Sequence, residues 1–145
     1  MKAHRSTLFA MAAVLAMAGC SSMDGMMNPS SSQHVALTGM NEVPAVQSPA
    51  SGSGTVTVNP DRTVSADISV SGMEATAAHI HEAAMGANGK VIVPLTKVGD
   101  NHFTAPAGAK LTEEQYEAYK AGDLYVNVHS AQHPGGEVRA QLAAR

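Results

Sequence analysis

Apolar and polar residues alternate with a period of two through most of the sequence after position 34. In "TVSADISV" (63–70) every second residue is apolar and the residues between are polar. Successive side chains of a strand point to opposite faces, so this pattern is typical of a strand buried on one side. "GTVTV" alternates in the same way, and "NPDR" between the two runs predicts a turn, so residues 54–70 are expected to form a hairpin.

Further strands are predicted where short alternating runs lie between turn signals such as "ANGK", "KVGDN" and "HPGG". They are expected at His34–Thr38, Thr76–Glu82, Lys90–Leu95, Asn101–Thr104, Asp123–Ser130 and Glu137–Leu142. One short helix is predicted at about 112–121, because Thr112 and Gln115 form a capping box and Gly122 can end the helix. Seven or eight strands with one helix predict an all-β fold, an antiparallel Greek-key or immunoglobulin-like β-sandwich.

The first twenty residues predict a targeting segment. A short basic start precedes an apolar run of about eleven residues, which is too short to span a bilayer core of roughly 30 Å and fits a signal peptide. The run ends at "LAMAGC", which resembles a bacterial lipobox. We therefore expect a lipoprotein signal peptide at 1–19, a lipid on Cys20, a tether at 20–33 and one folded domain at 34–143. An ordinary signal peptide followed by an incidental cysteine is the alternative.

The predicted tether is rich in Ser, Met, Asn and Pro and has no periodicity, which is typical of a flexible linker. Its methionines Met23, Met26 and Met27 are either soft thioether ligands for Cu(I) or incidental. By analogy with other lipoproteins, Ser21 and Ser22 after the cysteine favour anchoring in the bacterial outer membrane, with the domain facing the periplasm.

Charge and composition narrow the classes of partner. Of nine Lys and Arg, Lys2 and Arg5 leave with the signal peptide, so seven remain against twelve Asp and Glu, a net charge of −5. The remaining basic residues are scattered, which argues against a nucleic-acid partner. Cys20 is the only cysteine, so no disulfide can form within the chain. The expected partners are therefore the membrane, through the lipid, and a protein of the cell envelope.

A pair of histidines carries the candidate chemistry. In "AAHIHEAAMG", His79 and His81 are two positions apart on a predicted strand, so they share a face at a Cα separation of about 6.5 to 7 Å. Two imidazoles at that spacing can lean onto one ion at roughly 2 Å from each nitrogen. In "DLYVNVH" the apolar residues form one face and His129 lies on the other, so it is a third imidazole if this strand lies beside or faces the strand of His79 and His81. His133 in the following turn is a candidate fourth ligand.

Histidines on the polar face of a sandwich can equally be solvated and bind nothing. The two alternatives differ in geometry, because ring nitrogens within about 4 Å of one another favour a metal and splayed rings do not. The other two histidines of the domain, His34 and His102, have no such companions and are expected at the surface.

Several polar residues are candidates to surround the histidines: Glu42, Glu82, Asn127, Glu137 and Arg139. A carboxylate could accept the free imidazole N–H of a ligand histidine and so fix its tautomer. Glu137 and Arg139, however, are two positions apart on one predicted strand. The sequence slightly favours an ordinary exposed pair there, worth under about 1 kcal/mol.

Three segments resemble the CHRD domain, named from repeats in chordin: "LTGMNEVPAV", "AAHIHEAAMGANGKVIVPL" and "LYVNVHSAQHPGGEVRAQL". They occur in the expected order between Leu37 and Leu142. The resemblance implies a β-sandwich domain outside the cytoplasm, without a settled biochemical activity. It carries over these characteristic polar residues: Asn41, Glu42, His79, His81, Asn127, His129, Gly136, Glu137 and Arg139.

A weaker, local resemblance links "HIHE" and the late glycine-rich turn to copper–zinc superoxide dismutase. That enzyme needs a disulfide and further zinc ligands, whereas the loop "EAAMGANG" holds no histidine or aspartate. A complete dismutase site is therefore not expected, and no other catalytic arrangement is evident. We expect a binding protein, with copper favoured and zinc as the alternative, for capture, buffering or delivery of the metal. A protein-interaction module without metal is the second hypothesis, and redox chemistry at a bound copper is the third.

Overall fold

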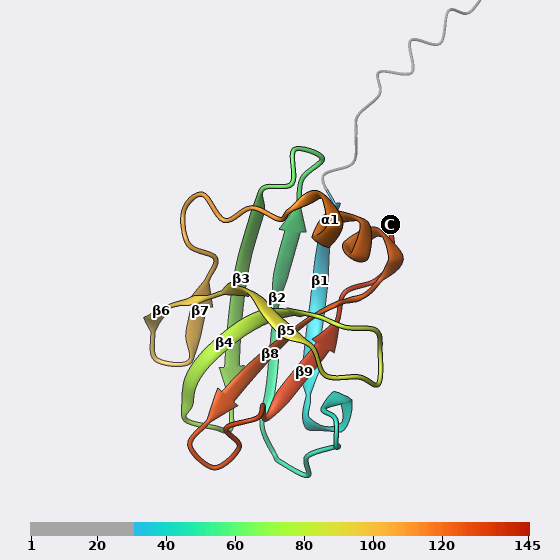
Figure 1. Cartoon of the computed structure of the whole chain (residues 1–145). Helices are drawn as coiled ribbons and strands as arrows, with labels where there is room; N and C mark the ends of the chain where they lie inside the picture. The colour runs from blue at the N-terminus through green and yellow to red at the C-terminus, as the bar shows by residue number, and fades with distance from the viewer. Residues whose placement is uncertain (1–30) are drawn as a thin grey trace, which may run out of the picture.

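The computed structural model describes residues 31–145, in which nine strands form one antiparallel sheet (Figure 1). The strands are β1 Ser31–Thr38, β2 Ser51–Val58, β3 Val64–Ser71, β4 Ala75–Glu82, β5 Lys90–Pro94, β6 Thr96–Gly99, β7 His102–Thr104, β8 Leu124–Ser130 and β9 Val138–Gln141. The helices are a 3-10 turn, η1 Gly39–Asn41, and one α-helix, α1 Glu113–Ala121. The order of the strands across the sheet is β5-β4-β8-β9-β1-β2-β3-β7-β6.

The sheet curls until its two ends meet, so the architecture is nearly that of a barrel. The outermost strands β5 and β6 are joined by the single residue Leu95, whose N–H donates to the carbonyl of Ala78 on β4. The Lys97 ammonium on β6 also donates to a β4 carbonyl, that of Ala75. The prediction of an all-β antiparallel fold with one helix is confirmed, and the predicted sandwich is a fair description of this curled sheet.

The alternation in the sequence corresponds to burial inside the curled sheet. On β3 the apolar residues Val64, Ala66, Ile68 and Val70 are buried and the residues between them are exposed. The strand pairs with β2 in a register that places Val58 opposite Val64, which confirms the predicted hairpin. Burying a Val or Ile side chain contributes about 1.5–3 kcal/mol, so this register is strongly favoured over a slip by one residue.

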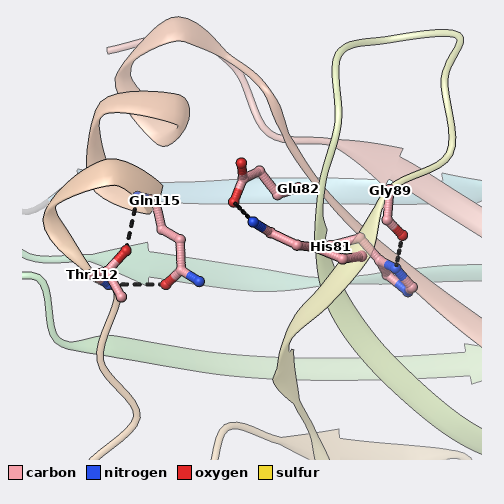
Figure 2. Close-up of polar contacts among 6 residues, drawn as sticks. His81, Glu82, Gly89, Thr112 and Gln115 are labelled. Atoms are coloured by element: carbon pink, nitrogen blue, oxygen red, sulfur yellow. Dashed lines mark hydrogen bonds and ion pairs between the residues drawn. The ribbon is translucent and has the colours of Figure 1, made fainter.

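Helix α1 begins and ends as its sequence predicts. Thr112 accepts a hydrogen bond from the Gln115 backbone N–H, and the Gln115 side chain accepts one from the Thr112 backbone (Figure 2). Gly122 ends the helix with a left-handed φ of 85°. Tyr119 is buried and Tyr116 packs against the core, so the two tyrosines attach the helix to the sheet.

Most strand boundaries differ from the prediction by one to three residues, and two of the differences change which segments belong to the sheet. Strand β6 includes residues of "KVGDN", where the sequence predicts a turn. All four residues of β6 are exposed, so the strand shows no alternation of apolar and polar residues that could have revealed it. Strand β1 begins at Ser31, three residues before the predicted start. Gln33, assigned from the sequence to the tether, is buried and exchanges hydrogen bonds with the backbone of Ala143.

The predicted signal peptide, Cys20 and the three tether methionines lie outside the described residues. Within residues 31–145, no helix has the length and apolarity needed to cross a membrane.

Candidate metal centre

The outward face of strands β4, β8 and β9 is covered by loops. All seven residues of β8 are buried, although alternation predicts that Tyr125, Asn127 and His129 lie on an open polar face. The loop 83–89 and the turn 131–136 cover this face, where they hydrogen-bond to side chains on the strands. A second buried layer, made of polar side chains, therefore lies on the opposite side of the sheet from the apolar core.

The structure brings the three predicted histidines together in this layer. In the register of β4 and β8, His129 lies opposite Ala77 and so diagonally from His79. The Nδ1 of His79 lies 3.0 Å from the Nε2 of His129. One ring nitrogen from each of His79, His81 and His129 lies within 4.8 Å of the other two. His81 and His129 are buried, and His79 is half-buried at the solvent edge.

Backbone carbonyls fix the tautomers of two of these rings. The Nδ1 of His81 lies 3.0 Å from the Gly89 carbonyl (Figure 2), and the Nδ1 of His129 lies 2.9 Å from the Pro134 carbonyl. A carbonyl only accepts, so each Nδ1 carries the hydrogen and each Nε2 carries a lone pair. The Nε2 of His129 meets His79, whereas the Nε2 of His81 is buried without a hydrogen-bond partner.

Burial favours the neutral form of two of the three rings, His79 and His129. Burial lowers the pKa of His79, and the neighbouring His129 and His81 lower it further. Burial also lowers the pKa of His129, although the Pro134 carbonyl partly offsets this effect. Metal ions bind neutral imidazole, so these lowered pKa values favour the ligand form of both rings.

Tyr125 and Arg139 continue the cluster into the polar layer. The rings of His81 and Tyr125 are parallel within 2°, with centroids 4.7 Å apart. On Tyr125, the Arg139 guanidinium carbon lies 3.4 Å from the ring centroid. The alternation in the sequence places Tyr125 on the same face of its strand as His129, but nothing in the sequence indicated that Tyr125 stacks between His81 and Arg139.

Arg139 holds the loop that fixes His81. Its guanidinium donates to the Ala87 carbonyl, the Asn88 side chain and the Gln141 side chain. The same loop presents the Gly89 carbonyl to His81 and the Gly89 N–H to the Tyr125 hydroxyl. The interpretation of Arg139 and Glu137 as an exposed ion pair is wrong, because loops cover both and each has other partners.

The carboxylates predicted around the histidines lie elsewhere in the layer. Glu82 is 3.5 Å from the Lys90 ammonium, and Glu137 accepts hydrogen bonds from the Ser48 and Ser130 hydroxyls. Burial opposes ionisation of Glu137, but these hydrogen bonds outweigh it and lower its pKa. The imidazole N–H groups of His81 and His129 are therefore held by backbone carbonyls instead of by these carboxylates.

Glu42 and Asn127 form a separate buried pair. Asn127 lies opposite His79 in the β4–β8 register, and its side chain hydrogen-bonds to Glu42. Burial raises the pKa of Glu42 to about 7, against the opposing effects of Arg139 and Asn127. One oxygen of each side chain, Oε1 of Glu42 and Oδ1 of Asn127, is buried without a partner.

His133 is not part of the cluster that the described residues form. It lies near Glu137, where its charge contributes to lowering the pKa of that carboxylate. His34 is exposed as predicted and its ring contacts Thr55, while His102, half-buried, pairs with Asp67.

One comparison with known proteins gives a match. The family model described as CHRD domain matches residues 34–142, a span that includes all three clustered histidines and the covered polar layer. No curated protein and no solved structure matches the chain. The local likeness to superoxide dismutase is therefore not shown.

Proposed function

This chain belongs to the CHRD domain family, and from that premise we propose that it binds a transition-metal ion through His79, His81 and His129. Copper is the favoured metal and zinc the alternative. The role of the protein would be the capture, buffering or delivery of copper in the bacterial cell envelope, where a lipid on Cys20 would anchor the chain to the outer membrane.

The convergence of the three imidazoles is the observation that carries the proposal. Two nitrogens bound to one ion at about 2.1 Å can be at most about 4.2 Å apart. Since the three lie within 4.8 Å, the rings need to approach by less than about 1 Å to bind one ion. The unpartnered Nε2 of His81 also finds a partner in that ion, which removes the cost of a buried, unsatisfied nitrogen.

Two properties of the cluster favour copper. Imidazole sites bind Cu(II) more tightly than the other divalent ions of the first transition series. The 3.0 Å between His79 and His129 is also the separation of two ligands at right angles on an ion about 2.1 Å away, as in a tetragonal Cu(II) site. In the ion-free protein the same distance is spanned by a hydrogen bond with His79 as donor, so the Nδ1 proton of His79 has to move to its Nε2 before both nitrogens can bind one ion.

Calorimetric titration of the full chain tests this function. We expect uptake of about one Cu(II) per chain, since one three-imidazole site holds one ion. His81→Ala should abolish that uptake, whereas His102→Ala, which removes an imidazole outside the cluster, should leave it intact. A parallel Zn(II) titration separates the two metals. No uptake of either ion at micromolar concentration would contradict the proposal and favour the protein-interaction module instead.

The envelope location rests on the lipobox-like sequence, so it needs its own test. Growth with a labelled fatty acid should label the wild-type chain, and Cys20→Ser should remove both the label and the sedimentation of the chain with membranes. Equal label or equal membrane association in wild type and Cys20→Ser would contradict the anchor without bearing on the metal site.

A further inference from the structure

We propose a second metal site, for a soft monovalent ion such as Cu(I), between the thioethers of Met40 and Met85. Both side chains line one cavity of about 550 Å³, which lies apart from the three histidines. Met40 belongs to η1 directly after β1, and Met85 belongs to the loop between β4 and β5, so the fold brings together two segments distant in sequence (Figure 1). The site goes beyond the proposed function, because it uses none of the histidine ligands.

The two thioethers are unusually accessible. Met40 is 67% exposed and Met85 is 80% exposed, the highest values among the large apolar side chains of the described residues. Met73, the third methionine in residues 31–145, is by contrast partly buried and packed against the core. Met40 and Met85 therefore contribute little to the core, and both sulfur atoms remain available to a ligand.

The chemistry of the cavity selects a soft ion. Thioether sulfur is a soft ligand that prefers Cu(I), whereas hard divalent cations prefer charged oxygen. The charged residues that line the cavity are Glu42 and Arg139, and together they provide no net negative charge to attract a hard cation. Methionine has three rotatable side-chain bonds, which allows two exposed sulfur atoms to turn toward one ion.

Nuclear magnetic resonance of the full chain with ¹³C-methyl methionine tests the site, with Ag(I) as a redox-inert probe of Cu(I) chemistry. We expect Ag(I) to shift the methyl signals of Met40 and Met85 and to leave Met73 unmoved. Met40→Leu and Met85→Leu should each weaken Ag(I) binding, while Met73→Leu should not. Leucine preserves size and apolarity, so the fold should be retained.

Two further variants separate the sources of binding. His79→Ala/His81→Ala removes the histidine cluster and should leave the Ag(I)-induced shifts of Met40 and Met85 in place. The methionine site is therefore tested independently of whether the histidine site binds a metal. A chain with Met23, Met26 and Met27 changed to Leu should still show both shifts. Unmoved Met40 and Met85 signals would overturn the proposal, including the case in which only the tether methionines respond.

Discussion

The imidazole of His81 lies flat against the ring of Tyr125, at a centroid separation of 4.7 Å and an interplanar angle of 2°. Arg139 covers Tyr125 in turn, with its guanidinium carbon 3.4 Å from the ring centroid. One face of the candidate ligand is thus fixed by stacking, and its Nδ1 is fixed by the Gly89 carbonyl. A ligand held in this way is already oriented before any ion arrives, which reduces the cost of binding.

Removing the Tyr125 ring should weaken metal binding. Tyr125→Leu keeps an apolar side chain but loses the stack on His81, and outer residues that orient a ligand are worth about 10–100-fold in metal affinity. Tyr125→Phe keeps the ring and loses only the hydrogen bond from the Gly89 N–H, so its affinity should stay near that of wild type. Competition titration against a Cu(II) chelator measures both. Equal affinity of Tyr125→Leu and wild type would show that the stack does not orient the ligand.

Replacing Arg139 should destabilise the whole domain. The side chain is 1% exposed and donates to the loop 83–89, and hydrogen bonds to a charged group contribute about 1.5–3 kcal/mol each. Arg139→Ala leaves the Ala87 carbonyl without this donor, and we expect a loss of at least about 3 kcal/mol in the free energy of unfolding. Arg139→Lys restores the charge but lacks the planar fork, so it should recover only part of the loss. Urea unfolding provides the measurement, and an unchanged midpoint for Arg139→Ala would contradict the assigned role.

Two adjacent glycines offer a matched comparison. Gly136 has a φ of 125°, and a Cβ there would lie 2.5 Å from both the Asn127 side-chain nitrogen and the Glu42 Oε1. Gly136→Ala should therefore cost about 1–3 kcal/mol of stability, whereas Gly135→Ala meets nothing within 4 Å and should be nearly neutral. Thermal unfolding of the two variants tests this difference, and equal melting temperatures would mean that the backbone at 136 is not closely packed against Glu42.

The raised pKa of Glu42 predicts how the stability of the folded chain changes with pH. Burial raises its pKa from 4.5 to about 7, so between these values the folded chain binds more protons than the unfolded chain. Its contribution to stability therefore falls as pH rises through that window and is constant above it. Glu42→Gln cannot ionise, so its stability lacks this contribution of residue 42 to the pH dependence. Stability of Glu42→Gln relative to wild type should increase from pH 4.5 to pH 8, and a difference independent of pH would contradict the raised pKa.

The sequence predicted those features that depend on local pattern. The alternation in β3 fixes which residues face the core, and the capping box at Thr112 with Gly122 fixes both ends of α1. The phase of His79, His81 and His129 placed each of them on the polar face of its own strand, whereas their convergence also required β4 and β8 to be neighbours, which the sequence left open. These predictions succeeded because period, cap and phase are set by residues near one another in the chain.

The buried polar layer could not be predicted in this way. It exists because the loop carrying Gly89 and the turn carrying Pro134 fold back over the sheet, and in the sequence both segments show only turn signals. Alternation alone therefore gave Arg139 and Glu137 as exposed residues. From the sequence, carboxylates were the expected acceptors of the imidazole N–H groups, whereas in the structure backbone carbonyls accept them.

Pulsed electron paramagnetic resonance of the one-to-one Cu(II) complex counts the imidazole rings on the metal and so tests the three-histidine site itself. We expect couplings from three imidazoles in the wild-type chain and from two in His129→Ala, measured at a Cu(II) concentration high enough to load that weakened site. The pattern of His102→Ala should match that of wild type. A Cu(II) spectrum without imidazole couplings, or one that His129→Ala leaves unchanged, would contradict the claim that His79, His81 and His129 bind a single ion.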